Sequence, residues 1–458
     1  MENRKDFASK LGMVLATAGS AVGLGNIWRF PVEAGSMGGA TFIFIYILCV
    51  VALGIPLAVA EFAVGRSAHS NTVSAYDKLT KNRFWRLTGR LGVFTGWIIM
   101  GYYVVVSGWT LAYLIKAVTM PPIHAADAVA KGGAYWQDFY DSFTTNTWLP
   151  VVCVLIFIML SHFVIVRGVQ GGIEKFSKVM MPVLFVILVV LCVSAFFMSG
   201  AREGLAFLFR PDFSQLKFST VLAALGQAFF SLSLGMGCLS TYASYFSRET
   251  NLTRTATQVA GIDTLVAIMA SIIIFPVVFS AGIEPSAGPS LVFVALPSVF
   301  EEVFGAWPWV AYFVSILFYF LLVIATLTSL ISLHEVLTAY MSEGFNMSRS
   351  KATSIVSISV VLVGAVCSLS WGPLADVKLF GLNLFGLFDW VSSRVLLVIG
   401  GGLIACFVGW KMDRMLLYNE LTSNGRIPLR HVSWIIFLLK WFAPILILLI
   451  FLSGIGVI

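Results

Sequence analysis

Apolar runs long enough to cross a bilayer recur along the whole chain, and short polar segments separate them. About 20 apolar residues span the hydrocarbon core of a membrane. The pattern predicts eleven membrane-spanning helices, near residues 11–33, 41–65, 90–117, 148–166, 176–199, 218–246, 258–281, 307–341, 352–371, 384–410 and 432–457. The apolar run at residues 288–304 is too short to cross, so we expect it to form a helical hairpin in the extracellular vestibule. The expected fold class is all-α integral membrane protein.

The basic residues predict how these helices are oriented. Arg and Lys concentrate in one alternating set of loops between the apolar runs. The positive-inside rule places those loops, and with them the amino terminus, in the cytoplasm. An odd number of spans then places the carboxyl terminus outside. We therefore expect a multi-pass protein of the plasma (inner) membrane.

Composition supports a membrane protein and excludes other classes. Hydrophobic residues make up 59% of the 458-residue chain and charged residues only 11%, against about 25% charged in soluble domains. The formal charge of +7 follows the loops, whereas nucleic-acid binding needs a basic stripe on a soluble face. The six cysteines lie in apolar runs without metal-ligand or redox-motif spacing. The first apolar run is too long for a signal peptide, so we expect it to remain as a helix.

Two predicted spans carry glycine-rich interruptions in mid-membrane. The first span contains three glycines within residues 18–26, and the sixth contains two within residues 231–237. Glycine disfavours helix, and unwound backbone at that depth is tolerated where it lines a cavity or is covered by protein. Close helix packing through small residues is the alternative interpretation of each segment. Spans one and six would each be the first helix of a five-helix half of the chain. Interruptions at matching positions of the two halves indicate a transport site between two repeats.

An opened helix offers the chemistry that ion-coupled transport needs. Its half-helix amino terminus suits a carboxylate, and its freed carbonyl oxygens suit a small cation such as sodium. In the eighth span, Thr328 and Ser329 place adjacent hydroxyl groups in a long apolar helix. Those hydroxyls could instead bond back to a carbonyl four residues earlier in the same helix. The residues alone leave both interpretations open.

These motifs resemble the neurotransmitter:sodium symporter family, including its bacterial amino-acid branch. The matching segments are GSAVGLGNIWRFP at 19–31, GQAFFSLSLGMG at 226–237 and ATLTS at 325–329, and the resemblance covers nearly the whole chain. It implies the LeuT fold, with 11 transmembrane helices in a 5+5 inverted repeat and unwound helices 1 and 6. The first repeat would comprise residues 11–200, the second 216–410, and an additional helix 432–457. The Gly-Met-Gly segment at 235–237 is similar to bacterial transporters of multiple hydrophobic amino acids.

The resemblance also implies one substrate site and two co-transported Na+ ions. The substrate would contact residues from spans one, three, six and eight: Ala21, Leu24, Gly25, Ile99, Tyr103, Phe230, Ser231, Ser233, Met236, Leu327 and Thr328. The first sodium site would use Ala21, Asn26, Ser231 and Asp263, together with the substrate carboxylate. The second would use Gly19, Val22, Ala325, Thr328 and Ser329.

Asp263 departs from a common family pattern, because many relatives carry Asn at the matching position. Chloride-dependent members of the family use a bound chloride to balance two sodium charges. A carboxylate one shell from sodium could supply that charge itself. Our hypothesis is that transport is independent of chloride, with Asp263 protonated on the empty return step. A capping role near a helix end is the alternative.

Charged residues near the ends of the spans suggest two gates. The resemblance pairs Arg29 with Asp389 outside the substrate, with Gln227 nearby and Phe230 as an aromatic lid. On the cytoplasmic side it pairs Arg4 with Glu343, with Tyr245 nearby. Ordinary interface charges are the alternative for each pair.

The sequence therefore predicts a sodium-coupled importer of hydrophobic, branched-chain and aromatic L-amino acids. A channel would need a continuous polar pore, whereas the polar residues gather at two breaks and one hydroxyl pair. We find no nucleophile–base constellation or metal cluster, so we expect no enzyme activity. A proton-coupled amino-acid permease with the same fold is the alternative, and the oligomeric state stays open.

Overall fold

A computed structural model describes residues 6–120, 133–280, 282, 291–303, 307–423, 425 and 429–457. Nearly all of the secondary structure is helical; the described residues contain one two-stranded antiparallel hairpin, β1 (Lys378–Leu379) with β2 (Leu382–Asn383). By length and composition, nine described helices could cross a membrane, and a bent helix pair raises the number to ten. The sixth predicted span is the one missing from that number, because its two halves are each too short.

The first five predicted spans are confirmed as helices. The first is α1 (Lys10–Ala21), followed by the π-helical turn η1 (Gly25–Arg29) and α2 (Phe30–Ser36). The others are α3–η2–α4 (Ala40–Cys49, Val50–Gly54, Ile55–Ala68), α6 (Arg83–Thr119), α9 (Leu149–Val166) and η3–α10 (Val169–Glu174, Lys175–Ala195). Shorter helices connect them: α5 (Thr72–Leu79), α8 (Gly133–Thr144), α11 (Ala201–Phe209) and the single turn η4 (Phe213–Gln215).

The remaining spans follow the same pattern. They are α12 with α13 (Phe218–Ser231, Cys238–Ala243), α14 (Leu252–Ser280), α16 (Pro308–Gly344), α17 (Arg349–Leu369), α18–η6–α19–η7 (Leu384–Trp390, Val391–Leu396, Leu397–Cys406, Phe407–Lys411) and α21–η8–α22 (Leu429–Phe437, Leu438–Phe442, Ala443–Gly454). The helix α20 (Arg414–Thr422) joins the last two spans. Within the predicted hairpin, the described part is one helical stretch, η5 (Leu291–Ala295) and α15 (Leu296–Val303); residues 288–290 and 304 lie outside the described residues.

Both predicted helix breaks are present. The first span leaves helical geometry at Val22 and resumes at Gly25 with a bend of 54°. In the sixth span α12 ends at Ser231, and the backbone takes left-handed conformations before α13 begins at Cys238. Gly235 has φ of +85°, and a Cβ there would lie 2.4 Å from the carbonyl oxygen of Leu397. Only glycine fits that position.

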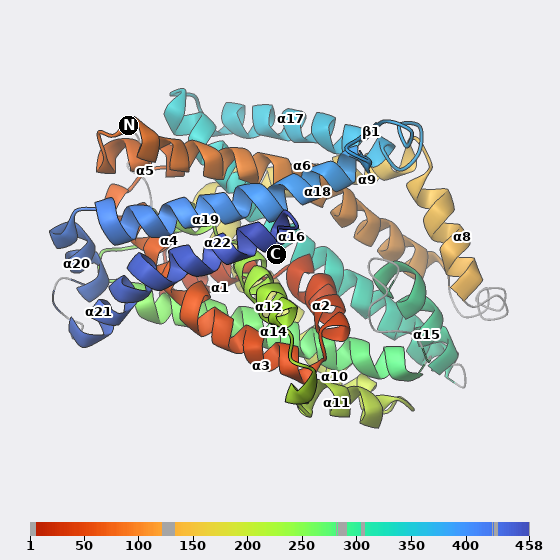
Figure 1. The fold of residues 1–458 in the computed structure, drawn as a ribbon. Coiled ribbons are helices and arrows are strands. Elements are labelled where there is room, and N and C mark those ends of the chain that lie inside the picture. The colour runs from red at the N-terminus through yellow and green to blue at the C-terminus, as the bar shows by residue number, and fades with distance from the viewer. Residues whose placement is uncertain are drawn as a thin grey trace.

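The two broken helices run through the middle of the bundle. Figure 1 shows α6 and α17 along one side and α3 and α14 along the other, with α1 and α12 between them. The long helices α6 and α16 pack against each other, and α9 and α17 pack beside them. On the other side α1 contacts α14, and α13 contacts α4. Because the breaks lie between these two groups of helices, the freed backbone groups face protein and an internal cavity instead of lipid.

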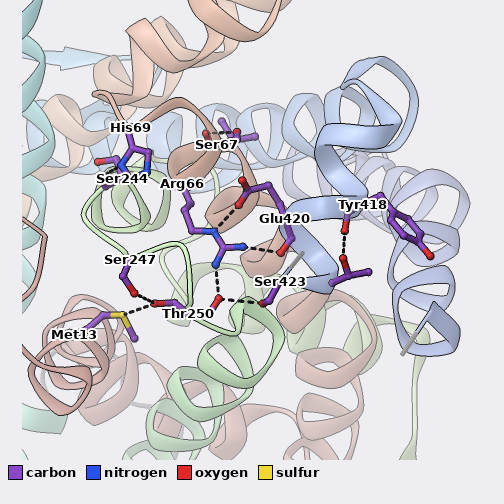
Figure 2. A network of polar contacts seen from close by, with 12 residues as sticks. Met13, Arg66, Ser67, His69, Ser244, Ser247, Thr250, Tyr418, Glu420 and Ser423 are labelled. Atoms are coloured by element: carbon purple, nitrogen blue, oxygen red, sulfur yellow. Dashed lines mark hydrogen bonds and ion pairs between the residues drawn. The ribbon is translucent and has the colours of Figure 1, made fainter. Parts of the chain in front are cut away.

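A buried ion pair joins three distant segments at the end of the bundle predicted to face the cytoplasm (Figure 2). Arg66, near the end of α4, bonds the Glu420 carboxylate and, at 2.6 Å, the Glu420 carbonyl oxygen on α20. It also donates to the carbonyl oxygen of Thr250, which precedes α14 and accepts from Ser423. The Arg66 side chain is 2% exposed. This network connects the second span to α20 and to the residues before α14, which are remote in sequence.

Candidate binding site at the two helix breaks

A cavity lies between the two breaks and the helices α6 and α16. About 420 Å³ of space between atoms lies there, part of it open to the surroundings of the cavity. The lining includes eight of the residues predicted to contact substrate: Ala21, Gly25, Ile99, Tyr103, Phe230, Ser231, Ser233 and Met236. Leu24, Leu327 and Thr328, also predicted, are buried beside the cavity without lining it.

The sequence did not single out five further lining residues as substrate contacts. They are Ser20, Gly23, Cys238, Ser329 and Leu333. Ser20 and Gly23 belong to the first break, and Ser329 was assigned to sodium alone. Cys238 and Leu333 carry no sequence signal, because both resemble ordinary apolar positions of a transmembrane helix. Their placement depends on how α13 and α16 pack against α6.

One end of the cavity presents polar groups. The backbone N–H of Leu24 donates to the Tyr103 hydroxyl at 3.3 Å, and the N–H of Gly23 donates to Asn26 Oδ1 at 3.0 Å. Immediately beyond, the backbone of Gly25 begins a continuous helical segment that runs to Ser36. The amino terminus of that segment, with the positive end of its helix dipole, faces the break, and the N–H groups of Asn26 and Ile27 donate to the carbonyl oxygen of Gly23 at 3.1 and 3.3 Å. This end can bind a carboxylate.

The predicted first sodium site forms a connected cluster. Asn26 Nδ2 donates to Asp263 Oδ1 at 2.7 Å and to Ser231 Oγ at 3.1 Å. Ser231 Oγ donates to Asp263 Oδ2 at 2.7 Å, and the Tyr46 hydroxyl donates to the same oxygen at 3.3 Å. All four side chains are buried. The structure therefore brings together Asn26, Ser231 and Asp263 as predicted, and it adds Tyr46 of α3, which the sequence did not single out.

The predicted second sodium site lies between α1 and α16. Ser329 Oγ donates to the carbonyl oxygen of Val22 at 2.8 Å. Thr328 Oγ1 donates to the carbonyl oxygen of Ala325 at 3.0 Å within its own helix. A Cβ on Gly19 would lie 3.5 Å from Thr328 Cβ, so α1 approaches α16 closely here. The hydroxyls of Thr328 and Ser329 thus lie at one helix crossing, together with the carbonyl oxygens of Val22 and Ala325.

The predicted outer gate residues lie above the cavity without the predicted ion pair. The Arg29 guanidinium lies 4.4 Å from the centre of the Phe230 ring and 3.9 Å from the Glu33 carboxylate. Gln227 Nε2 donates to the carbonyl oxygen of Gly25 at 2.9 Å. Among the described residues, Arg29 and Asp389 form no ion pair within 4.0 Å. Pairing of these two in another state of the protein stays a prediction.

On the opposite side, Arg4 lies outside the described residues, so its pairing with Glu343 stays a prediction. The Glu343 carboxylate accepts from the backbone N–H of Asn71 at 2.8 Å. The Tyr245 hydroxyl donates to Glu335 Oε1 at 2.7 Å, and Glu335 also pairs with Arg349. A hydrogen bond and an ion pair therefore connect the segment that follows α13 to α16 and α17 on this side.

Comparison with known proteins identifies the family. A family model described as the sodium:neurotransmitter symporter family matches residues 4–128 and 131–458. The chain belongs to this family. It is 37% identical over 452 residues to the uncharacterized sodium-dependent transporter YhdH of Bacillus subtilis, a match that covers 98% of each protein. A sodium-dependent transporter of Haemophilus influenzae is 32% identical, over 99% of this chain and 98% of the relative.

The chain is also similar to a solved structure over nearly its whole length. The crystal structure of MhsT in complex with L-phenylalanine matches with a TM-score of 0.89 and 41% identity, covering 99% of this chain and 100% of MhsT. The match confirms the LeuT fold predicted from the sequence. The chain is therefore a multi-pass membrane transporter of a sodium symporter family, with the cavity and both oxygen clusters at its two breaks.

Proposed function

We propose that this transporter carries hydrophobic L-amino acids, both branched-chain and aromatic, into the cell together with sodium by alternating access. One observation carries the proposal: the cavity between the two breaks has a polar end and an apolar wall. The helix amino terminus at Gly25 and the Tyr103 hydroxyl form the polar end, while Ile99, Met236 and Leu333 line the wall. The inward sodium gradient across the membrane would set the direction of transport.

The amino-acid backbone of the substrate would bind at the polar end. Its carboxylate would meet the N–H groups near Leu24 and Gly25 and the Tyr103 hydroxyl. Its ammonium group would meet carbonyl oxygens near Ala21, Phe230 and Ser231. The apolar side chain would then extend along Ile99 toward Met236. The L-phenylalanine named in the MhsT complex has this division into a charged end and an apolar end, which supports the assignment.

Two Na+ ions would bind at the two oxygen clusters. The first would take the Ala21 carbonyl, the side-chain oxygens of Asn26 and Ser231, and the substrate carboxylate, with Asp263 next to it. The second would take the carbonyls of Gly19, Val22 and Ala325 and the hydroxyls of Thr328 and Ser329. The substrate carboxylate would be a ligand of the first sodium ion. Bound sodium would therefore raise the affinity for the substrate, and bound substrate would raise the affinity for sodium by the same factor. This reciprocity couples sodium binding to substrate binding.

Uptake into proteoliposomes tests the sodium coupling. We expect labelled leucine or phenylalanine to accumulate under an inward sodium gradient and not under potassium with an inward proton gradient. Accumulation under the proton gradient alone would instead identify the alternative, a proton-coupled permease of the same fold. Competition by unlabelled amino acids then defines the substrate class. Competition by glycine or alanine alone would overturn the hydrophobic specificity.

The environment of Asp263 supports chloride independence. Its carboxylate receives hydrogen bonds from Asn26, Ser231 and Tyr46, and a carboxylate held by three donors beside the first ion can balance sodium charge. We expect uptake to be unchanged when gluconate replaces chloride on both sides of the membrane. Collapse of uptake in gluconate, with recovery on return of chloride, would refute this part of the proposal while leaving sodium coupling intact.

A further inference from the structure

At Gly96, next to two residues that line the apolar end of the cavity, α6 presents no side chain. Ile99 and Tyr103 of α6 line the cavity, and Gly96 lies on the same face of the helix, three residues before Ile99 and seven before Tyr103. Seven residues of α-helix advance about 10 Å. Gly96 is therefore about two turns from the polar end that would hold the substrate carboxylate.

The surroundings of Gly96 place it beside the apolar end of the cavity. A Cβ built there would have two neighbours within 4 Å outside its own helix: the Met236 carbonyl oxygen at 3.6 Å and Leu333 Cδ2 at 3.8 Å. Met236 and Leu333 both line the cavity. Both distances are ordinary van der Waals contacts, so a methyl group fits at this position.

Other glycines of α6 have a different reason to be glycine. A Cβ would lie 2.7 Å from the Thr72 carbonyl oxygen at Gly89, 2.6 Å from Val363 at Gly101, and 3.2 Å from Cys153 at Gly108. These three residues permit close approach of neighbouring segments. Helix packing does not require a glycine at Gly96, and glycine inside a helix is disfavoured by roughly 1 kcal/mol relative to alanine.

We propose that Gly96 is a specificity-determining residue that sets the depth of the side-chain pocket. The space left by its missing side chain, between Met236 and Leu333, takes the far end of an aromatic substrate side chain. A shorter side chain, such as that of valine, ends nearer Ile99 and does not reach this space. This inference rests on the proposed function, since it names the feature that lets the transporter accept large hydrophobic amino acids.

Gly96→Ala tests the inference directly. We expect the apparent affinity for tryptophan and phenylalanine to fall at least about tenfold relative to that for valine, because one methylene in an apolar pocket changes discrimination by 10-fold or more. The measurement is competition against labelled leucine at saturating sodium, with wild type and variant assayed together. An unchanged tryptophan-to-valine ratio would overturn the inference.

Gly92→Ala is the matched control. Gly92 lies one turn away on α6, and a Cβ there would contact the backbone of Met236 and Gly237 at 3.5 Å. Since it does not approach Leu333, we expect it to keep the wild-type ratio. A ratio that changes equally in both variants would assign the effect to movement of the sixth span and overturn the role of Gly96.

A second variant keeps the test independent of the first. Leu333→Ala removes atoms from the facing wall, so Gly96→Ala combined with Leu333→Ala should recover affinity for tryptophan. Leu333→Ala alone should shift preference toward the largest substrates, even if Gly96→Ala proves unstable. An unchanged preference would contradict the inference that Gly96 and Leu333 border the same part of the pocket. If wild type binds no hydrophobic amino acid at all, the proposed function fails, which is distinct from failure of this inference.

Discussion

Ser329 and Thr326 lie three residues apart on α16, yet their hydroxyl groups have different partners. Thr326 Oγ1 donates to the carbonyl oxygens of Leu322 and Val323 in its own helix. Ser329 Oγ donates to the carbonyl oxygen of Val22 across the helix crossing. The sequence left open whether the hydroxyls of this span bond back to their helix or face another one. The structure assigns the first role to Thr326, and also to Thr328, whose hydroxyl donates to the carbonyl oxygens of Ile324 and Ala325. It assigns the second role to Ser329.

Ser329→Ala should weaken apparent sodium affinity about tenfold, because a polar contact to a charged partner contributes about 1.5 kcal/mol. Titration of sodium-dependent leucine uptake or binding measures the change. Thr326→Ala is the control: its hydroxyl is buried to a similar degree but bonds within its own helix, so sodium affinity should stay near the wild-type value. Equal losses in both variants would contradict the assignment of Ser329 to the second sodium site.

At the level of the helices, glycine allows the sixth span to open without clashing with its neighbours. Gly235 donates its backbone N–H to Glu61 Oε1 at 2.7 Å, so a carboxylate from α4 binds one of the freed amide groups. A Cβ on Gly400 would lie 2.5 Å from the Gly235 carbonyl oxygen, so α19 approaches the break closely. The break is therefore held by its neighbours on two sides.

Gly235→Ala should destabilise the protein by about 2 kcal/mol or more, through a left-handed backbone and a clash with Leu397. Gly226→Ala in α12 is the control, because a Cβ there meets no atom within 4 Å and alanine favours helix. Thermal unfolding in detergent compares the two. A melting temperature for Gly235→Ala equal to that of wild type would show that the segment tolerates a side chain.

Across the whole molecule, buried polar contacts join segments that are distant in sequence. Arg66 is the clearest example, since it joins α4 to α20 and to the residues before α14 (Figure 2). A charge removed from water is tolerated only when it is paired. Arg66 and Glu420 thus depend on each other.

Arg66→Met should cost about 3–5 kcal/mol of stability, because it leaves the Glu420 carboxylate buried without its partner. Arg86→Met is the control: its pair with Asp77 is exposed, with side chains 36% and 40% accessible, and such pairs contribute at most about 1 kcal/mol. Unfolding in denaturant measures both. Adding Glu420→Met to Arg66→Met should recover part of the loss, and a further loss instead would argue against mutual dependence.

The sequence by itself determined the eleven spans, the two breaks and the family. These properties are local: apolar length decides whether a segment crosses the bilayer, and clustered glycines decide where a helix opens. The sodium ligands implied by the family resemblance stay a prediction, although the structure brings the side chains of Asn26, Ser231 and Asp263 into one cluster. Local pattern was sufficient for the spans and the breaks because each of them lies within a single segment of the chain.

Only the tertiary structure decided which residues from different spans meet. Tyr46 reaches Asp263, Arg29 lies over Phe230 and beside Glu33 instead of pairing with Asp389, and Gly96 faces Leu333. The partners in these contacts come from separate helices, except for Arg29 with Glu33. The distances between these partners depend on how the helices cross and rotate against each other. A membrane helix is apolar on nearly every face, so its sequence does not show which face packs against which neighbour. Contacts between helices therefore required the packed fold.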